Sequence, residues 1–324
     1  MTILNTFAAN PLDRSGNLRK DKKWIISKIN HPQAKFIPML NLKAPIEKVS
    51  NAFHIKYLNR NQVKKIINDF SDLIFLGIRD QMPYFSLNIS ESININHLFK
   101  SDVNFQEVRN AAMFLTNEEA SILALARSMI EWSQNNIFCS KCGNKTIFDQ
   151  GGYVKLCVNK NCNKETFPRT DPVVIMLVYN GDNCLLGRQQ HFPKKFFSVL
   201  AGFMEPGESI ENAVYREVEE ETSIRVNNIM YHSSQPWPYP SSLMIGCFAK
   251  AENSKIVIDE KEIVEAKWTE RKIVSEAIIK SKSSKNDPLD PNNYEINGDI
   301  LLPPPMAIAH QLLNFWSNNP KSFL

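Results

Sequence analysis

The distribution of apolar and polar residues predicts short strands and one helix in the first part of the chain. Residues 73–77 and 83–87 are apolar runs on either side of Asp80-Gln81, which predicts two strands joined by a turn. Residues 61–70 repeat their apolar positions at helical spacing, which predicts a helix. The chain up to residue 115 therefore has an α+β pattern, and no group of residues within it suggests catalysis.

A longer helix is predicted from residue 117 to residue 135. Thr116 and Glu119 have the spacing of a capping box, in which each side chain accepts a hydrogen bond from the other residue's backbone. The apolar residues that follow recur on one helical face, which we interpret as a packing surface rather than a cofactor site: Ile122, Leu125, Ala126, Met129 and Trp132.

The pattern changes near residue 171, where apolar strands begin to alternate with helices. Residues 173–178 are a continuous apolar run, and residues 184–188 are predicted to pair with it after a turn at 180–183. The remaining predicted elements are strands near 229, over 243–249 and over 266–269, and helices over 209–221 and up to Trp316. This order predicts a mixed sheet with helices packed against it, an α/β/α sandwich.

Composition and charge indicate an ordinary globular chain. Its 324 residues are too many for a single core, and 43% are hydrophobic and 22% charged. The net charge of +4 is too small for a dedicated nucleic-acid binder. No apolar run reaches the length of a membrane span, and the first residues lack the apolar core of a signal peptide, so we expect a cytoplasmic protein. The polar stretch 281–299 is expected to be a mobile insertion.

Four of the six cysteines are paired at metal-ligand spacing. Cys139 and Cys142 are separated by two residues and Cys157 and Cys162 by four, with a hairpin-length segment between the pairs. This order favours a structural zinc ion in a zinc ribbon, and the alternative is a set of cysteines without a metal. We therefore expect three parts: an N-terminal α+β domain over residues 1–135, a zinc ribbon over 136–168, and the α/β/α domain over 169–324.

The segment 202–224 concentrates acidic residues between a glycine turn and a predicted helix, for which Ser209 is a suitable N-cap. Glu217 and Glu221, four residues apart, lie within the sector of the helix's apolar face. Two inward carboxylates repel unless a cation lies between them, and oxygen ligands favour a hard divalent ion such as Mg²⁺. Arg216 is expected to hold a carboxylate through paired hydrogen bonds, and Glu219 is expected to face solvent. The alternative is a Glu-rich surface helix.

The spacing in this segment resembles the Nudix box, the metal-binding loop and helix of the Nudix hydrolases. The positions that match are Gly202, Glu208, Arg216, Glu217, Glu220 and Glu221. Ser223 stands where the family has glycine. If that glycine closes the helix in a left-handed conformation, serine costs about 1 kcal/mol or less and leaves the chemistry intact.

A second motif begins ten residues after the box, at Ser234. It consists of Ser234, Gln235, Pro236, Trp237, Pro238, Tyr239, Pro240, Ser241 and Ser242. This segment is similar to SQPWPFPxS, the motif of the NADH pyrophosphatase branch of the Nudix hydrolases, with tyrosine in place of the usual phenylalanine. The cysteine ribbon and the segments FPRTDPVVIM and PPPMAIAHQLL also resemble this branch.

This resemblance implies a hydrolase that cleaves the pyrophosphate of NAD(H) to AMP and nicotinamide mononucleotide. The implied ligands of Mg²⁺ or Mn²⁺ are Glu217, Glu220, Glu221, Glu262 and the carbonyl of Ala201. The implied substrate contacts are Phe203 and Trp237, which would stack on a base, together with Gln235, Pro236, Pro238, Tyr239, Pro240, Ser241, Ser242 and Ala309. Members of this branch are usually homodimers, and we expect Glu220, or else Glu262, to take the proton of the attacking water.

Two alternatives remain open. The same site could serve NAD-capped RNA or another dinucleotide, and the sequence does not rank these substrates. A binding protein that keeps the fold without the chemistry would have lost box glutamates, and none is lost here.

Overall fold

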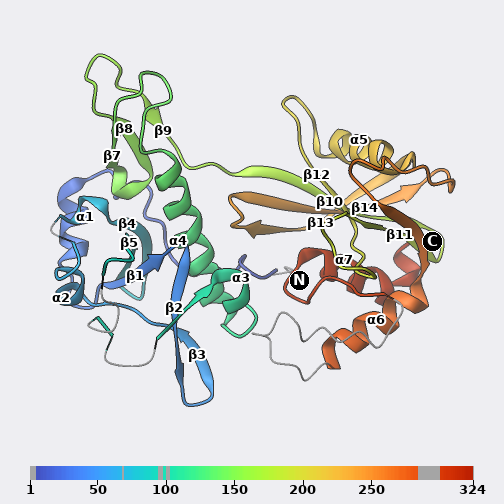
Figure 1. The fold of residues 1–324 in the computed structure, drawn as a ribbon, viewed down its shortest axis with the longest axis horizontal. Helices are drawn as coiled ribbons and strands as arrows, with labels where there is room; N and C mark the ends of the chain where they lie inside the picture. The colour runs from blue at the N-terminus through green and yellow to red at the C-terminus, as the bar shows by residue number, and fades with distance from the viewer. Residues whose placement is uncertain (1–4, 68, 94–97, 100–102, 284–299, 324) are drawn as a thin grey trace. The chain divides into compact units, whose positions relative to one another are not determined.

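The computed structural model describes residues 5–67, 69–93, 98–99, 103–283 and 300–323. The chain forms two compact units (Figure 1). The C-terminal unit comprises Met1–Ala8, Asp171–Pro236 and Ser242–Leu324, and the N-terminal unit comprises Ala9–Thr170 and Trp237–Ser241. Most of the stretch expected to be a mobile insertion, residues 284–299, lies outside the described residues. The division into three domains at residues 135 and 168 stays a prediction.

The described part of the N-terminal unit is built from short strands and helices. Its strands are β1 (Lys35–Leu40), β2 (Lys43–Val49), β3 (Ala52–Ile55), β4 (Ile74–Arg79), β5 (Met82–Ile89) and β6 (Asn104–Glu107). Its helices are α1 (Lys22–Ile29), α2 (Arg60–Val63), α3 (Val108–Ala111) and α4 (Asn117–Asn135), with the 3₁₀ helix η1 (Phe70–Asp72). The sheet has the order β3-β2-β1-β5-β4, and β6 pairs with β2. It is mixed, because β1 and β5 are parallel whereas β4 and β5 form the predicted antiparallel hairpin.

The helix predicted over residues 61–70 is wrong in its length. Among the described residues of this stretch, which leave out residue 68, the α-helix is limited to α2; it begins at a capping box formed by Asn59 and Gln62, and residues 64–66 continue as a turn. Val63 is buried, and Ile66 and Ile67 pack against the same core. The apolar spacing here serves tertiary packing, and β-branched residues add little intrinsic preference for continuing a helix.

Helix α4 is confirmed over its predicted length and packs against β1, β4 and β5. Its N-terminus departs from the predicted capping box. The hydroxyl of Thr116 accepts the N–H of Glu119 at 3.2 Å, but the Glu119 carboxylate accepts the N–H of Ile55 at 3.1 Å. Because Ile55 ends strand β3, Glu119 ties the helix to the sheet instead of closing the box.

The same unit contains the predicted ribbon. It consists of β7 (Thr146–Asp149), β8 (Val154–Cys157) and β9 (Glu165–Thr166), with the 3₁₀ helix η3 (Gln150–Gly152) between the first two. Gly152 has a φ of +92°, and a Cβ on it would lie 3.0 Å from the Cα of Ile74. This glycine therefore allows the turn of the ribbon to lie directly against strand β4.

The C-terminal unit is the predicted sheet between helices. Its elements are β10 (Asp171–Asn180), β11 (Asn183–Arg188), β12 (Leu200–Phe203), α5 (Ile210–Thr222), β13 (Val226–Trp237), β14 (Ser242–Ala251), β15 (Glu265–Glu270), α6 (Arg271–Ser283), α7 (Ile308–Asn318) and the 3₁₀ helix η4 (Pro320–Phe323). The sheet has the order β13-β14-β10-β11-β15, and β12 pairs with β10. β10 is parallel to β14 and antiparallel to β11 and β12, so the sheet is mixed.

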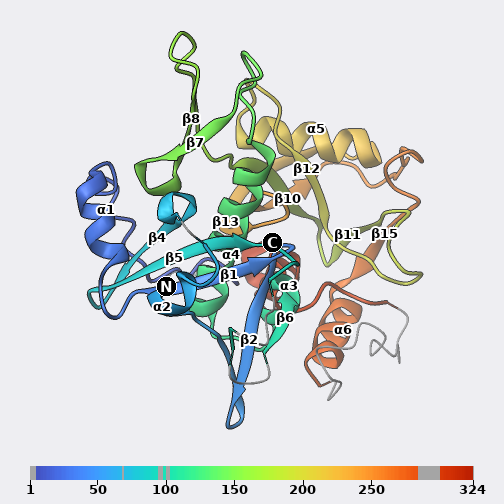
Figure 2. The same cartoon turned by 60° about the vertical axis from the view of Figure 1, so that its left-hand side comes forward.

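Alternate residues of the central strand β10 face two different helix layers. Val174 and Met176 share a core with Val218 of α5, whereas Leu177 shares a core with Leu312 of α7. Helix α5 accordingly lies on one side of the sheet, and α6 and α7 lie on the other (Figures 1 and 2). Within the described residues, no helix has both the length and the apolar character that crossing a membrane requires.

Helix α5 has the predicted N-cap at Ser209 and a left-handed residue at its C-terminal end. The hydroxyl of Ser209 accepts the N–H of Asn212 at 3.2 Å and so caps the first turn. The helix ends at Thr222, and Ser223 adopts the left-handed conformation with φ 57° and ψ 20°. Serine therefore occupies a backbone position that glycine adopts without steric cost.

Candidate active site and metal centres

Arg216 fastens the loop between β12 and α5 to the helix. Its Nε and Nη2 donate to the two carboxylate oxygens of Glu208 at 2.6 and 2.9 Å, the paired geometry expected from the sequence. Nη2 also donates to the carbonyl of Phe203 at 2.9 Å. The Arg216 guanidinium lowers the pKa of Glu208 to about 2. Glu208 is therefore a fixed anion that holds Arg216 and is unsuited to proton transfer.

Gly202 leaves the space that the Glu217 carboxylate fills. A Cβ on Gly202 would lie 1.9 Å from Cδ of Glu217 and 2.1 Å from each of its oxygens. Arg216 Nη1 donates to Glu217 Oε1 at 2.8 Å, so the carboxylate is held between a guanidinium and the backbone of β12. The glycine is required here for close approach, because any side chain would displace the carboxylate.

Three carboxylates converge beside this contact. Oxygen atoms of Glu217, Glu221 and Glu262 lie within 4.8 Å of one another. Glu217 and Glu221 are only 8% and 4% exposed. Burial, with the nearby charges of Glu217, Glu262 and Glu220, raises the pKa of Glu221 to about 8. Burial also raises the pKa of Glu217.

This donor set fits a divalent cation. Oε2 of Glu221 is buried and makes no hydrogen bond. A buried carboxylate oxygen without a partner is costly, and a cation between the carboxylates would offset both its lost hydration and their mutual repulsion. The ligands of the cluster are oxygen atoms, which favour Mg²⁺ or Mn²⁺ over softer metals.

Glu262 reaches the cluster from a later loop that is tied to the end of α5. The N–H of Asp259 donates to the carbonyl of Glu221 at 3.2 Å, and the N–H of Val257 donates to the carbonyl of Thr222 at 3.0 Å. The N–H of Glu262 donates in turn to the carbonyl of Asp259 at 3.1 Å. The loop and the helix therefore position their carboxylates together.

The fourth acidic residue implied as a ligand, Glu220, lies outside this cluster. Its side chain is 60% exposed and accepts a hydrogen bond from Arg216 Nη1 at 3.2 Å. Glu219 is exposed, as expected. Ala201, whose carbonyl is the remaining implied ligand, lies in β12 directly before Gly202.

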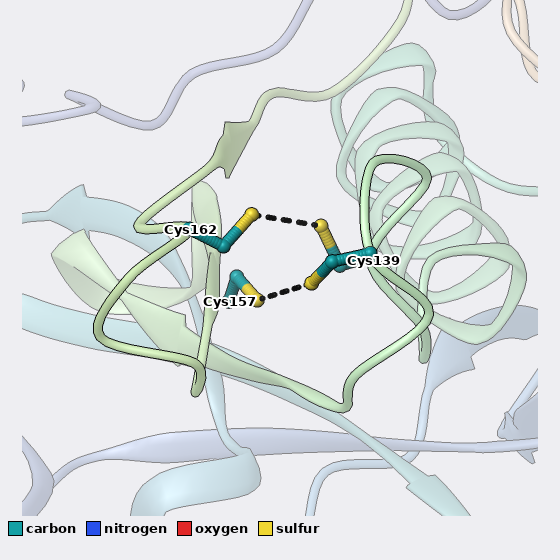
Figure 3. Close-up of side chains that lie close together, drawn as sticks. Cys139, Cys157 and Cys162 are labelled. Atoms are coloured by element: carbon teal, nitrogen blue, oxygen red, sulfur yellow. Dashed lines mark hydrogen bonds between the residues drawn. The ribbon is translucent and has the colours of Figure 1, made fainter.

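The four ribbon cysteines form a second possible metal centre. Their sulfur atoms lie within 4.8 Å of one another, with Cys139 3.8 Å from Cys162 and Cys142 3.4 Å from Cys157. Figure 3 shows the side chains of Cys139, Cys157 and Cys162 pointing toward a common centre. Hydrogen bonds, first of all from the backbone of Asn144, lower the pKa of Cys142 to about 6, which favours the thiolate. Four converging thiols fit a tetrahedral structural zinc ion.

Two of the implied substrate residues lie in the C-terminal unit with very different exposure. Phe203, at the end of β12, is exposed, as a residue that stacks on a base must be. Ala309 is buried in the core between α7 and the sheet. Its methyl group is therefore part of the packing of α7.

Gln235 has a structural role that sequence reasoning missed. Its side chain is fully buried, and its amide nitrogen donates to the carbonyls of Thr6 and Met306 at 3.0 and 2.8 Å. Its amide oxygen accepts the N–H of Ile308 at 2.8 Å. Gln235 therefore joins the N-terminal segment, strand β13 and the start of α7. No local pattern signals this role, because all three partners are distant in sequence.

The rest of the proline-rich motif is divided between the units. Pro236 is exposed near the end of β13, and Ser242 is buried at the start of β14. The five residues between them belong to the N-terminal unit: Trp237, Pro238, Tyr239, Pro240 and Ser241. Within this turn, the ring of Trp237 meets that of Tyr239 edge-on, with centroids 5.5 Å apart.

Comparisons with known proteins match both halves of the chain. The NUDIX domain family matches residues 169–288, and the NADH pyrophosphatase-like rudimentary NUDIX domain family matches residues 33–132. The chain is 35% identical over 353 residues to the NAD-capped RNA hydrolase NUDT12 of Homo sapiens, covering 96% of this chain and 73% of that protein.

Two further relatives carry related names. The mitochondrial NAD(P)H pyrophosphatase NUDT13 of Homo sapiens is 38% identical over 260 residues, covering 76% of this chain and 71% of that protein. The NAD-capped RNA hydrolase NPY1 of Saccharomyces cerevisiae is 30% identical over 384 residues, covering 99% of this chain and 97% of that protein. The acidic segment 202–224 lies inside the first matched region.

Proposed function

This chain belongs to the Nudix hydrolase family, and we propose that it hydrolyses the pyrophosphate bond of NAD(H) to AMP and nicotinamide mononucleotide. The observation that carries this proposal is the convergence of Glu217, Glu221 and Glu262, with an unpartnered oxygen on Glu221. Such a site is built to hold a cation against phosphate oxygens. The names of the relatives, NAD(P)H pyrophosphatase and NAD-capped RNA hydrolase, support a nicotinamide dinucleotide as the substrate.

In this proposal some residues would bind the metal ion, and another would accept a proton from water. Glu217, Glu221, Glu262 and the carbonyl of Ala201 would hold Mg²⁺ or Mn²⁺, which would offset the charge of the two phosphates and acidify a water molecule. Arg216 keeps Glu217 in place, since it is itself fixed by Glu208. Gly202 allows this arrangement because it has no side chain.

Glu220 is the proposed general base. Its exposure and its place outside the three-carboxylate cluster leave it free to accept a proton from water, and Arg216 orients it. Glu220 could also join the ligand set once a cation is bound, in which case Glu262 becomes the base.

Selectivity for a dinucleotide requires flat apolar surfaces. We assign Phe203 and Trp237 to stack on the bases, since aromatic rings bind bases through their faces. The backbone of the motif from Gln235 to Ser242, together with Ala309 at the start of α7, shapes the rest of the substrate site. For Gln235 and Ala309, whose side chains are buried, this role falls on the backbone they position.

NAD-capped RNA is the second candidate substrate. This candidate is favoured by a relative named as an NAD-capped RNA hydrolase, whose alignment covers 96% of this chain. Its reactive group is the same pyrophosphate, so the same carboxylates would serve both substrates.

Purified protein assayed with NADH and Mg²⁺ or Mn²⁺ tests the proposal. We expect AMP and reduced nicotinamide mononucleotide as products. Each of the single variants Glu217→Gln, Glu220→Gln and Glu221→Gln should have a kcat at least about 100-fold lower, as expected for loss of a metal ligand or general base. Glu219→Gln is the matched control, because it removes the same charge from the exposed side of the same helix and should leave kcat unchanged.

The outcome that contradicts the proposal is inactivity toward NADH together with efficient hydrolysis of a nucleoside triphosphate. Efficient decapping of NAD-capped RNA with slow hydrolysis of NADH would instead favour the second candidate. Near-normal turnover in all three Gln variants would show that the site is elsewhere.

Three further properties belong to the same proposal. We propose that the ribbon cysteines hold zinc for structure, supported by their convergence. We propose a homodimer, supported by the branch that the motifs resemble. We propose the cytoplasm as the location, supported by free cysteines in metal-ligand spacing, which fit a reducing compartment.

A further inference from the structure

The turn that carries Trp237 is held by a buried arginine of helix α4. Arg127 donates hydrogen bonds to the carbonyl of Pro238 and to the carboxylate of Glu131, one turn further along the helix. Its guanidinium carbon lies 4.2 Å from the centre of the Tyr239 ring. The Arg127 side chain is only 9% exposed. All of these contacts lie within the N-terminal unit.

Burying the charged guanidinium of Arg127 costs more desolvation free energy than burying an apolar side chain would. A buried guanidinium is stabilised only where its charge and its donors are matched, and Nε of Arg127 remains without a hydrogen bond. Glu131 balances the charge, Pro238 supplies a backbone acceptor, and Tyr239 supplies an aromatic face. Only the planar, multiply donating side chain of arginine combines these three contacts, since lysine presents a single point charge.

The contacts of Arg127 lead directly to the ring proposed to bind substrate. Tyr239 meets the guanidinium on its face and the ring of Trp237 edge-on. Pro238, whose carbonyl Arg127 holds, is the residue that follows Trp237 in the chain. Loss of Arg127 would therefore release both the backbone that follows Trp237 and the aromatic ring that its own ring contacts.

We propose that Arg127 is a positioning residue for the substrate base, acting through Pro238 and Tyr239 to fix the Trp237 ring in the orientation that stacks on a dinucleotide. This inference rests on the proposed function and extends it to the N-terminal unit.

Kinetics of Arg127→Met test the proposal, with Arg109→Met as the matched control. Arg109 is exposed and its guanidinium carbon lies 6.0 Å from the same Tyr239 ring, so the control removes a similar charge without releasing the turn. We expect Arg127→Met to raise KM for NADH roughly tenfold with a much smaller change in kcat, the size of a weakened base stack. Arg109→Met should change neither.

Combination with Trp237→Ala distinguishes positioning from a general structural role. If Arg127 acts through Trp237, then Arg127→Met should cause no further loss of kcat/KM in the Trp237→Ala protein. An equal loss of kcat/KM in both backgrounds would overturn the proposal, as would a fall in kcat at constant KM.

A fluorescence measurement tests the role of Arg127 independently of activity toward NADH. The fluorescence of Trp237 is obtained as the difference between each protein and its Trp237→Phe counterpart. Acrylamide should quench this fluorescence more strongly in Arg127→Met than in the unaltered protein, because the indole ring becomes more accessible. Arg109→Met should leave the quenching unchanged. Inactivity of the unaltered protein toward NADH would refute the proposed function, and unchanged quenching would refute the anchoring by Arg127. If Arg127→Met does not fold, Arg127→Lys replaces it, with a smaller change expected in the same direction.

Discussion

At the residue scale, the acidic cluster combines burial with unmatched charge. Glu221 is buried, one of its oxygens lacks a partner, and its neighbours Glu217 and Glu262 carry the same charge. In the absence of a cation, this arrangement favours the protonated carboxyl, whose pKa is raised to about 8 by burial first and by these charges second. The site is therefore destabilising until a cation binds.

This imbalance predicts how the stability of the metal-free protein depends on pH. In the unfolded chain the Glu221 carboxyl loses its proton near its ordinary pKa of 4.5, and in the folded chain near pH 8. Between these values the folded state binds more protons, so the free energy of unfolding should fall as pH rises, by about 1.4 kcal/mol for each pH unit. Urea unfolding at pH 5, 6.5 and 8 in the presence of a chelator measures this fall.

Glu221→Gln should remove most of the fall, because glutamine does not titrate. The variant should therefore be more stable than the unaltered protein at pH 8 when no metal is present. Glu219→Gln, which alters an exposed residue, should keep the original dependence. The same pH dependence in Glu221→Gln and the unaltered protein would contradict the proposed burial of charge.

Ser223 provides a second prediction at this scale. Its left-handed conformation disfavours any residue with a Cβ, so Ser223→Gly should raise the free energy of unfolding by up to about 1 kcal/mol. The gain is limited because glycine also makes the unfolded chain more flexible. Urea unfolding measures the change, and Ser223→Ala, which keeps the Cβ, should give no gain. The kcat should stay unchanged, since Ser223 lies outside the carboxylate cluster.

At the scale of elements, helix α5 and the zinc ribbon are stabilised in different ways. Helix α5 packs an apolar face against the sheet, and Glu217 and Glu221 lie beside that face. The ribbon has short strands, and several of its large apolar side chains are exposed, among them Phe138 and Ile147. A segment that buries so little apolar surface needs another source of stability, which a metal ion held by the four cysteines would supply.

Cys142→Ser should therefore lower the zinc content and the thermal stability of the protein. The catalytic cluster lies in the other compact unit, so dependence of kcat on Mg²⁺ or Mn²⁺ should change much less. Elemental analysis and thermal unfolding measure the two effects. Ser140→Ala, in the exposed knuckle between the first two cysteines, is the control and should retain zinc. Equal zinc content in both variants would show that the cysteines do not bind it.

At the scale of the whole molecule, one motif contributes residues to both compact units. Gln235 is embedded in the C-terminal unit by three hydrogen bonds, whereas Trp237 and Tyr239 belong to the N-terminal unit. The motif is therefore divided between the two units.

Trp237→Ala tests what the motif contributes to recognition. Loss of a stacked base is worth about 1–3 kcal/mol, so kcat/KM for NADH should fall roughly tenfold to a hundredfold. A minimal pyrophosphate substrate without a base at that position should be affected much less, because the carboxylates are intact. Steady-state kinetics on both substrates provide the measurement. An equal loss on both would mean that Trp237 supports the fold rather than the base.

Features that depend on short spacing can be predicted from the order of the amino acids alone. The cysteine pairs, the N-cap at Ser209, the hairpin at Asp80-Gln81 and the inward side of α5 all follow from residues within a few positions of one another. Backbone geometry fixes how such neighbours lie, so the N-cap, the hairpin and the inward side of α5 are confirmed, whereas zinc binding by the cysteines stays a prediction. The same locality carried the family resemblance, since both motifs are continuous segments.

Which distant groups meet follows from the folded chain and not from local spacing. The tertiary structure gave Glu119 a partner in β3, buried Gln235 among three separate segments, and placed Glu262 rather than Glu220 in the carboxylate cluster. The helix predicted from residue 61 is also shorter than expected, and its apolar residues Val63, Ile66 and Ile67 pack in one core. These outcomes depend on long-range packing, where many partners are chemically acceptable and the shape of the folded chain selects one.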